Sequence, residues 1–148
     1  MTTVRDLLKG REDKTIWALR PDMTVMDALK EMAAHNVGAM PVLEDDRLVG
    51  VFSERDYARR AVVKGEFTND TPLRDAMTRE VVTVTMDDTL DYVMRLMSEK
   101  HIRHLPVVED HKLVSHFSIR DVMQWMIDTQ KQQIDRLQDY IEGGGYAQ

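Results

Sequence analysis

Hydrophobic and polar positions follow two different periods in the first half of the chain. Between Val25 and Met32 apolar residues recur every three or four positions, which predicts an amphipathic helix. Thr24 precedes this run and Asp27 follows three residues later, the pattern of a helix-capping box. Two short apolar runs come next, Met40–Leu43 and Leu48–Phe52, with only polar residues between them. They predict a β-hairpin whose loop is the four residues from Glu44 to Arg47.

The second half of the chain repeats this order. Residues 15–60 align with residues 80–125 without a gap, and the strongest agreement lies in the hairpin. The matching elements are a helix that begins at Thr89, a strand at Leu105–Val108, a turn at Glu109–His111 and a strand at Leu113–Phe117. The chain is therefore a tandem repeat, in which each unit needs its neighbour to cover its apolar face.

Further elements complete each repeat. Short strands are expected before the first helices, at Thr15–Leu19 and Val81–Thr85, and second helices are expected after Ser53 and Ser118. The order in each repeat is then β-α-β-β-α. Because each small sheet has one apolar face to cover, we expect an α/β fold in which the two repeats pack sheet to sheet about a pseudo-twofold axis.

The predicted division of the chain follows the repeat. Residues 1–68 form the first repeat, residues 69–130 the second, and residues 131–148 a helical extension with its tail. The segment Lys64–Thr71, which contains glycine, asparagine and aspartate, is the expected linker.

The tail carries its own pattern. No proline or glycine occurs between Ile119 and Ile141, so we expect one long helix there. Within it Ile127, Ile134 and Ile141 recur every seven residues, and Gln130 interrupts the apolar row. The row either packs back on its own domain or pairs with a helix of a second copy. We favour the second copy, and predict a homodimer whose second helices pack across a twofold axis.

Composition excludes several classes of function. The 148 residues contain no cysteine, which rules out disulfides and thiolate metal sites. A net charge of −6 argues against a nucleic-acid partner. No apolar stretch resembles a signal peptide or a membrane span, so we expect a cytoplasmic protein without a membrane partner. The five histidines are scattered, and no nucleophile–base or glycine-rich phosphate motif occurs. We expect no catalytic residues, no metal site and no enzymatic activity.

The duplicated motifs carry a family resemblance. Met40-Pro41-Val42-Leu43-Glu44-Asp45 matches Leu105-Pro106-Val107-Val108-Glu109-Asp110, and a Ser-x-x-Asp element begins each second helix, at Ser53 and at Ser118. This pattern resembles the CBS domain pair, or Bateman module, over about residues 1–130. The resemblance implies a non-enzymatic regulatory module that binds AMP, ADP, ATP, NAD or S-adenosylmethionine in clefts between its repeats, and that signals through dimer geometry or a regulated protein partner. It implies no catalytic cofactor.

The resemblance also implies two sets of ligand-binding residues. One cleft combines Ser53, Arg55 and Asp56 with Thr78, Ile102, Arg103, His104 and Pro106. The other combines Ser118, Arg120 and Asp121 with Asp13, Thr15, Val37, Gly38, Ala39 and Pro41. In each cleft the aspartate would accept hydrogen bonds from the ribose hydroxyls, and the helix start with nearby cations would face phosphate.

The two clefts differ in chemistry. Gly38 and Ala39 stand in the second cleft where Arg103 and His104 stand in the first, so we expect the Asp56 cleft to hold more phosphate charge. The hairpin glycine of the first repeat, Gly50, is replaced by Ser115-His116 in the second, which predicts a narrower Asp121 cleft. Ser-x-x-Asp is also an ordinary helix cap. The alternative function is therefore a structural dimerisation or protein-interaction module with vestigial clefts.

Overall fold

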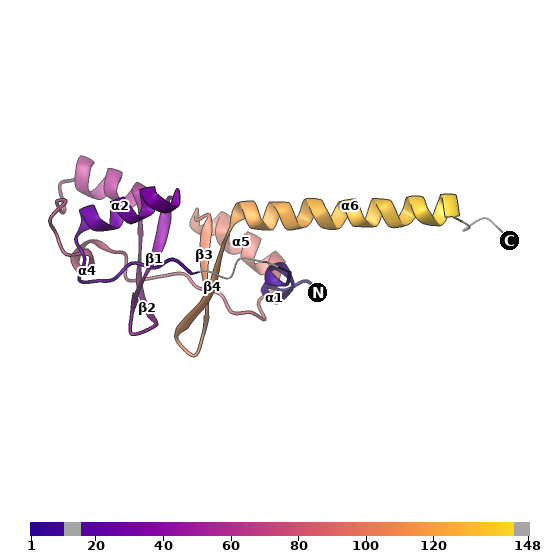
Figure 1. Ribbon diagram of the computed structural model, residues 1–148, viewed down its shortest axis with the longest axis horizontal. Helices are drawn as coiled ribbons and strands as arrows, with labels where there is room; N and C mark the ends of the chain where they lie inside the picture. The colour runs from indigo at the N-terminus through magenta and orange to yellow at the C-terminus, as the bar shows by residue number, and fades with distance from the viewer. Residues whose placement is uncertain (11–15, 144–148) are drawn as a thin grey trace.

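The two predicted repeats form the body of the protein, and a long helix extends from the second one (Figure 1). The structure is a computed structural model and describes residues 1–10 and 16–143. Two β-hairpins lie side by side, with helices packed around them. This arrangement confirms the predicted mixed α/β fold with two repeats.

The helix-strand-strand-helix part of each repeat occurs in the predicted order, and each half of the chain opens with a short helix that was not predicted. The first repeat contains α1 (Val4–Leu8), α2 (Val25–His35), β1 (Ala39–Glu44), β2 (Arg47–Ser53), α3 (Glu54–Asp56) and the π-helix η1 (Tyr57–Val63). The second contains α4 (Leu73–Ala76), α5 (Leu90–Lys100), β3 (His104–Glu109), β4 (Lys112–Ser118) and α6 (Ile119–Gly143).

The helices begin where the sequence places them. The Thr24 hydroxyl accepts a hydrogen bond from the backbone N–H of Asp27, and the Asp27 carboxylate accepts one from the backbone N–H of Thr24. The Thr89 hydroxyl likewise accepts the N–H of Tyr92. These bonds satisfy backbone donors that have no partner within the helix.

The hairpin turns are tighter than the predicted four-residue loop. Glu44 pairs with Arg47, so only Asp45–Asp46 connect the strands. Both turn residues have positive φ, 52° and 66°, and Asp110–His111 repeat this geometry with 51° and 66°. Two consecutive residues with positive φ match the twist of an antiparallel pair, and aspartate tolerates this conformation better than most residues do.

The expected first strands, Thr15–Leu19 and Val81–Thr85, are reduced to one bridging residue each. Leu19 donates its N–H to Pro41 O (2.8 Å) and accepts the N–H of Leu43 (2.9 Å). Val84 bonds in the same way to Pro106 and Val108. Toward the N-terminus, the next bond of each parallel ladder would need a backbone N–H from Pro41 or Pro106. Proline has no N–H, so the ladder stops there. Thr15 lies outside the described residues.

The hairpins meet at a narrow contact. The strand order is β1-β2-β4-β3, and in the described part of the chain β2 and β4 pair at one position, Arg47 with Lys112. Within each hairpin the antiparallel pairing is extensive, from Ala39–Ser53 and from His104–Ser118 to the turns. The two hairpins therefore face each other beyond this contact without a continuous ladder.

Each repeat supplies its opening helix to the other repeat's core. Val4 and Leu7 of α1 are buried with Val93 and Phe117 of the second repeat. Leu73 and Ala76 of α4 are buried in the core of the first repeat. Because each core contains a helix from the other half of the chain, the two repeats stabilise each other.

The expected linker at Lys64–Thr71 connects the two repeats, and one of its residues, Phe67, is buried in the core of the first repeat. Phe67 is buried against Phe52, and the Tyr57 hydroxyl donates a hydrogen bond to Asn69 Oδ1 (2.8 Å). Thr71 O accepts the N–H of Val25 (3.0 Å). The connection is therefore exposed along most of its length, and Phe67, Asn69 and Thr71 attach it to the first repeat.

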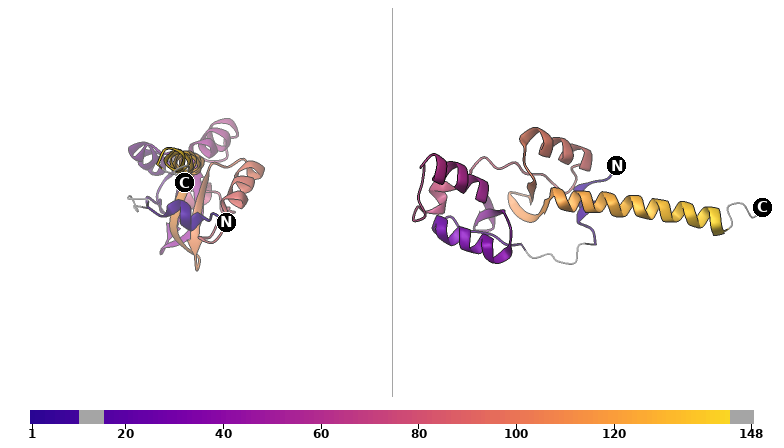
Figure 2. Two further views of the ribbon diagram at one scale, coloured as in Figure 1. Left: turned by 90° about the vertical axis from the view of Figure 1, so that its right-hand side faces the viewer. Right: turned by 90° about the horizontal axis from the view of Figure 1, so that it is seen from above.

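The long helix leaves the body of the protein. It runs from Ile119 to Gly143, two residues beyond the predicted end at Ile141, and projects away from both hairpins (Figure 2). Val122 is its one buried residue, close to the start. The alternative in which this helix packs back on its own domain is therefore not the observed arrangement.

A close contact beside Gly50 leads to a stability prediction. A Cβ at this position would lie 2.6 Å from Met77 Sδ and 2.9 Å from Thr78 O. We expect Gly50→Ala to destabilise the fold by about 1–3 kcal/mol, because the Thr78 backbone must move. Gly38→Ala is the matched control, since a Cβ there meets no atom within 4 Å. Urea unfolding measures both, and equal midpoints for the two variants would contradict the prediction.

Candidate functional site

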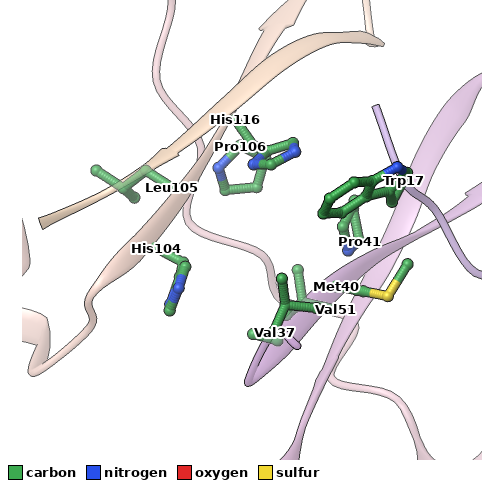
Figure 3. A pocket seen from close by; sticks show the side chains of 10 residues that line it. Trp17, Val37, Met40, Pro41, Val51, His104, Leu105, Pro106 and His116 are labelled. Carbon is green, nitrogen blue, oxygen red and sulfur yellow. The ribbon is translucent and has the colours of Figure 1, made fainter. Parts of the chain in front are cut away.

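A cavity lies between the two hairpins, at the end where β1 and β3 begin (Figure 3). It measures about 470 Å³, including space open to solvent. The first repeat contributes Trp17, Val37, Ala39, Met40, Pro41 and Val51, and the second contributes His104, Leu105, Pro106 and His116. Both halves of the chain are therefore needed to form it.

Equivalent residues of the two repeats line the cavity. Ala39-Met40-Pro41 and His104-Leu105-Pro106 occupy the same positions of their hairpins, as do Val51 and His116. Figure 3 shows Trp17 and Pro41 on one side, facing Pro106 and His116. The walls are largely apolar, with imidazoles on the side of the second repeat. Such a site suits a flat group that is apolar on its faces and polar at its edge.

Trp17 is the largest ring in the cavity wall. Its indole stacks on His35, with ring centroids 4.2 Å apart and an interplanar angle of 19°. Trp17 lies within the expected first strand Thr15–Leu19, whose first residue, Thr15, the resemblance assigned to the Asp121 cleft. Neither Trp17 nor His116 was among the predicted binding residues. An aromatic side chain in that segment was the available signal.

Ser53 and Asp56 begin the second helix of the first repeat. The Ser53 hydroxyl accepts the backbone N–H of Asp56 (3.0 Å), so the serine acts as the helix cap. The Asp56 carboxylate is half-buried, and no side chain or backbone donor of the described residues hydrogen-bonds to it. Arg55, beside it, is exposed. This carboxylate is therefore available to an incoming hydroxyl group.

Ser118 and Asp121 form the equivalent helix start in a different state. The Asp121 carboxylate accepts the Ser118 N–H (2.8 Å) and the Ser118 hydroxyl (3.3 Å). The Ser118 hydroxyl is also within 3.3 Å of the Asp121 N–H, which closes a reciprocal cap. Arg120 is exposed. The second carboxylate must therefore give up bonds of its own helix cap to bind a ligand through the same oxygen.

Each helix start is bonded to the residues before the Pro-Val strand of its own repeat. Glu54 donates its N–H to Gly38 O (2.9 Å), and Ile119 donates its N–H to Arg103 O (2.8 Å). His104 pairs with Ser118 across the hairpin. The structure thus brings Gly38 and Ala39 close to Ser53, and Arg103 and His104 close to Ser118.

The predicted clefts also require contacts between repeats. The cavity brings Val37, Ala39 and Pro41 together with His104 and Pro106, which the resemblance assigned to opposite clefts. In the described part of the chain neither Arg103 nor His104 forms an ion pair with Asp56. That Arg103 and His104 bind the same ligand as Asp56 stays a prediction.

Two of the predicted residues, Thr78 and Ile102, do not line the cavity. Thr78 exchanges two backbone hydrogen bonds of 2.9 Å with Val51, at the edge of the cavity. Ile102 is half-buried and packs on the core of the second repeat. Asp13 and Thr15 lie outside the described residues.

The electrostatics of the cavity centre on His104. Desolvation of its imidazole lowers the pKa of His104, the Asp121 carboxylate raises it, and the Arg103 guanidinium lowers it. The net direction is downward. At neutral pH the imidazole is therefore neutral, and can donate one hydrogen bond and accept another.

Other candidate sites are less well supported than the cavity between the hairpins. A wider cleft near the turns is lined by Arg47, Arg79 and His111 among others, and it contains none of the predicted binding residues. Across residues 1–10 and 16–143, no three histidine or acidic side chains are grouped to hold a metal ion. No helix within those ranges is long and apolar enough to cross a membrane.

Comparison with known proteins identifies the family. The family model described as "CBS domain" matches residues 4–62 and again residues 73–128. The chain belongs to the CBS domain family. This confirms the resemblance carried by the two Pro-Val and Ser-x-x-Asp motifs.

Similar CBS proteins include both sequence and structure matches. The mitochondrial CBS domain-containing protein CBSX3 of Arabidopsis thaliana is 36% identical over 97% of this chain and 73% of its own length. The structure of a protein with CBS domains from Burkholderia ambifaria is 36% identical, with a TM-score of 0.78 over 86% of this chain and 95% of that chain.

A further solved structure shows a CBS pair with ligands. The CBS domain pair of protein MJ0100 was solved in complex with 5′-methylthioadenosine and S-adenosyl-L-methionine. It is 26% identical to this chain, with a TM-score of 0.73 over 87% of this chain and 98% of that chain. CBS pairs of this fold thus include proteins that bind adenosine-containing molecules.

The environment of His104 predicts how its proton affinity responds to mutation. By NMR titration we expect the pKa of His104 to lie below the ordinary histidine value of about 6.5. Asp121→Asn keeps a cap acceptor but removes a charge, and should lower this pKa further. Arg103→Gln should raise it.

The lowered pKa of His104 also determines how the stability of the fold changes with pH. Because the unfolded chain binds a proton at His104 more readily than the folded protein does, acidification through about pH 6.5 destabilises the fold. A His104→Asn variant should lose less stability over that range. A His104 pKa above the ordinary value, or shifts in the same direction for both neighbouring variants, would contradict this assignment.

Proposed function

We propose that this CBS pair is a non-enzymatic regulatory module that binds an adenosine-containing ligand, AMP, ADP, ATP or NAD, between its two repeats. The observation that carries the proposal is the half-buried Asp56 carboxylate, which no donor of the described residues satisfies. A ligand that supplies hydroxyl donors can bond to this carboxylate without displacing a hydrogen bond among the described residues.

The cavity between the hairpins suits the purine base. Pro41, Val51 and Pro106 give it apolar walls, and the Trp17 indole adds an aromatic face held by its stack on His35. A purine is flat and apolar on its faces, so it gains from burial against such walls. The neutral His104 imidazole and backbone groups of the strands can hydrogen-bond to the polar edge.

The ribose and phosphates are assigned to the helix start. An ionised aspartate has two oxygens that can accept both hydroxyl protons of a cis-diol. Ser53 caps the same turn, so Asp56 can bind a ligand without opening the cap. Arg55 on this helix and Arg103 from the other repeat are the cations assigned to phosphate oxygens.

The MJ0100 complex supports the ligand class. Its two ligands share the adenosine group and differ in what is attached at the 5′ position. The adenosine group is the part that our assignment places on the apolar walls and on Asp56. The choice among AMP, ADP, ATP and NAD depends on the cations and is the finer part of the proposal.

The regulatory step would be a shift between two arrangements of the repeats. A ligand that contacts both hairpins favours the arrangement in which both contacts are made, and only by its difference in affinity. Because the hairpins pair at Arg47 and Lys112 alone in the described part, no continuous strand ladder opposes such a bias. We assign the readout to a cytoplasmic homodimer and a regulated protein partner.

A structural interaction module is the second candidate. The closed cap at Ser118 and Asp121, and His116 in place of Val51, favour loss of the second cleft. If both clefts are vestigial, the protein dimerises or binds a partner without any nucleotide.

Calorimetry separates the two candidates. With AMP, ADP, ATP and NAD in turn, we expect at least one to bind with micromolar affinity, about −8 kcal/mol. Chromatography of the same mixtures should recover the nucleotides unchanged. Folded protein that binds none of them at millimolar concentration would overturn the proposal and favour the interaction module.

Substitution of the two aspartates tests the ranking of the clefts. Asp56→Ala should weaken the tightest ligand by about 1.5–3 kcal/mol, because a hydrogen bond to a charged group is lost. Asp121→Ala should weaken it less and should reduce helix stability instead, because its carboxylate serves the cap.

Glu54→Ala is the matched control, since it removes an exposed carboxylate from the same turn as Asp56. An affinity loss for Asp121→Ala that equals or exceeds the loss for Asp56→Ala would show that the ranking is wrong. So would an equal loss for the control.

A further inference from the structure

The long helix α6 carries an apolar row that nothing in the described chain covers. Met123, Ile127, Ile134, Leu137 and Ile141 are between 52% and 62% exposed. Successive members are separated by three, four or seven residues, which places them on one side of the helix. The helix has 25 residues, about 37 Å, and projects beyond the body of the protein (Figures 1 and 2).

The row is distinct from the side of α6 that packs on its own repeat. Val122 is buried in the core of the second repeat, and Ile119 and Trp125 pack against that core. Ile127 follows Trp125 by two residues, and residues two apart do not share a face of a helix. The first turn is therefore anchored on one side while the row faces solvent on another.

We propose that this row pairs with the same row of a second copy, as a parallel two-stranded coiled coil in register. Ile127, Ile134 and Ile141 occupy one core position of successive heptads, and Met123 and Leu137 occupy the other. β-branched residues at the first position with leucine-like residues at the second favour two parallel strands.

Gln130 and Lys131 distinguish the parallel from the antiparallel pairing. In the parallel register Gln130 faces the partner subunit's Gln130, and the two amides can hydrogen-bond to each other. The antiparallel register that aligns the whole row places Gln130 against the partner subunit's Ile134, where its amide has no partner. It also brings the two Lys131 side chains together, which like charges oppose. A single polar residue in the core row is a known means of fixing register.

The remaining charges are compatible with a second copy as the partner. Asp128, Asp135, Arg136, Asp139 and Glu142 all lie off the core row and its flanking positions. The flanks are Gln124, Lys131 and Gln138 on one side, and Met126, Gln133 and Tyr140 on the other. Lys131 is the one charged residue among these flanking positions, so the parallel register brings no like charges together. The flanks also lack the row of charges that would attract a helix of opposite charge from another protein.

This inference deepens the proposed homodimer and is independent of the ligand. A parallel coiled coil holds both CBS pairs at the same end of the dimer. A change that a ligand causes in one CBS pair then occurs next to the same change in the CBS pair of the second copy.

Cysteine cross-linking tests the register, because the chain contains no cysteine of its own. Full-length Leu137→Cys, treated with a mild oxidant, should form a disulfide dimer on a non-reducing gel within minutes. Gln132→Cys, on the outer face of the same helix, is the matched control and should cross-link at least tenfold more slowly. A mixture of Leu137→Cys with Ile127→Cys should yield each homodimer and little of the mixed species.

Predominant cross-linking between positions 127 and 137 would show an antiparallel pair and overturn the proposal, as would equal rates at positions 137 and 132. Light scattering of the full-length protein and of Ile134→Glu separates the remaining outcomes. We expect a dimer for the former and at least a tenfold weaker dimer for the latter. A dimer unaffected by Ile134→Glu would retain the homodimer and reject the coiled coil, whereas a monomeric wild type would reject both.

Discussion

The missing N–H of two prolines shapes the space between the repeats. Pro41 and Pro106 stand one residue before the positions where the first segments of each repeat pair with the hairpins. Because a proline cannot donate to the next bond of the parallel ladder, each pairing ends after one residue. Residues 16–18 are thereby released from the sheet, and Trp17 lines the cavity instead of continuing a strand.

The exchange of opening helices makes the two repeats one unit. The core of each repeat contains apolar side chains from the other's first helix, Val4 and Leu7 in one case and Leu73 and Ala76 in the other. The hairpins themselves share little pairing, so this exchange is what fixes them around a common cavity. A ligand that contacts both hairpins consequently acts on a surface that the buried cores hold together.

The two Ser-x-x-Asp motifs share one pattern, but their aspartate carboxylates differ in hydrogen bonding. The Ser-x-x-Asp pattern predicts an N-terminal helix cap in both, and both caps are present. Sequence could not show that one aspartate is committed to its cap and the other is not, because this depends on side-chain rotation within the same local pattern. The repeat, the hairpins, the caps and the extent of α6 could be predicted because periodicity and short-range bonds determine them. The two-residue turns, the single-residue bridges and the burial of Phe67 depend on backbone dihedral angles and contacts that periodicity does not report.

The central claim is that an adenosine group binds between the repeats through Asp56. A crystal structure of the full-length protein with the nucleotide that binds most tightly tests this most directly. The account predicts the purine in the cavity, in contact with residues of both hairpins, and both ribose hydroxyls within about 3 Å of the Asp56 carboxylate. A nucleotide bound outside this cavity, or one whose ribose contacts Asp121 and leaves Asp56 unpaired, would contradict it.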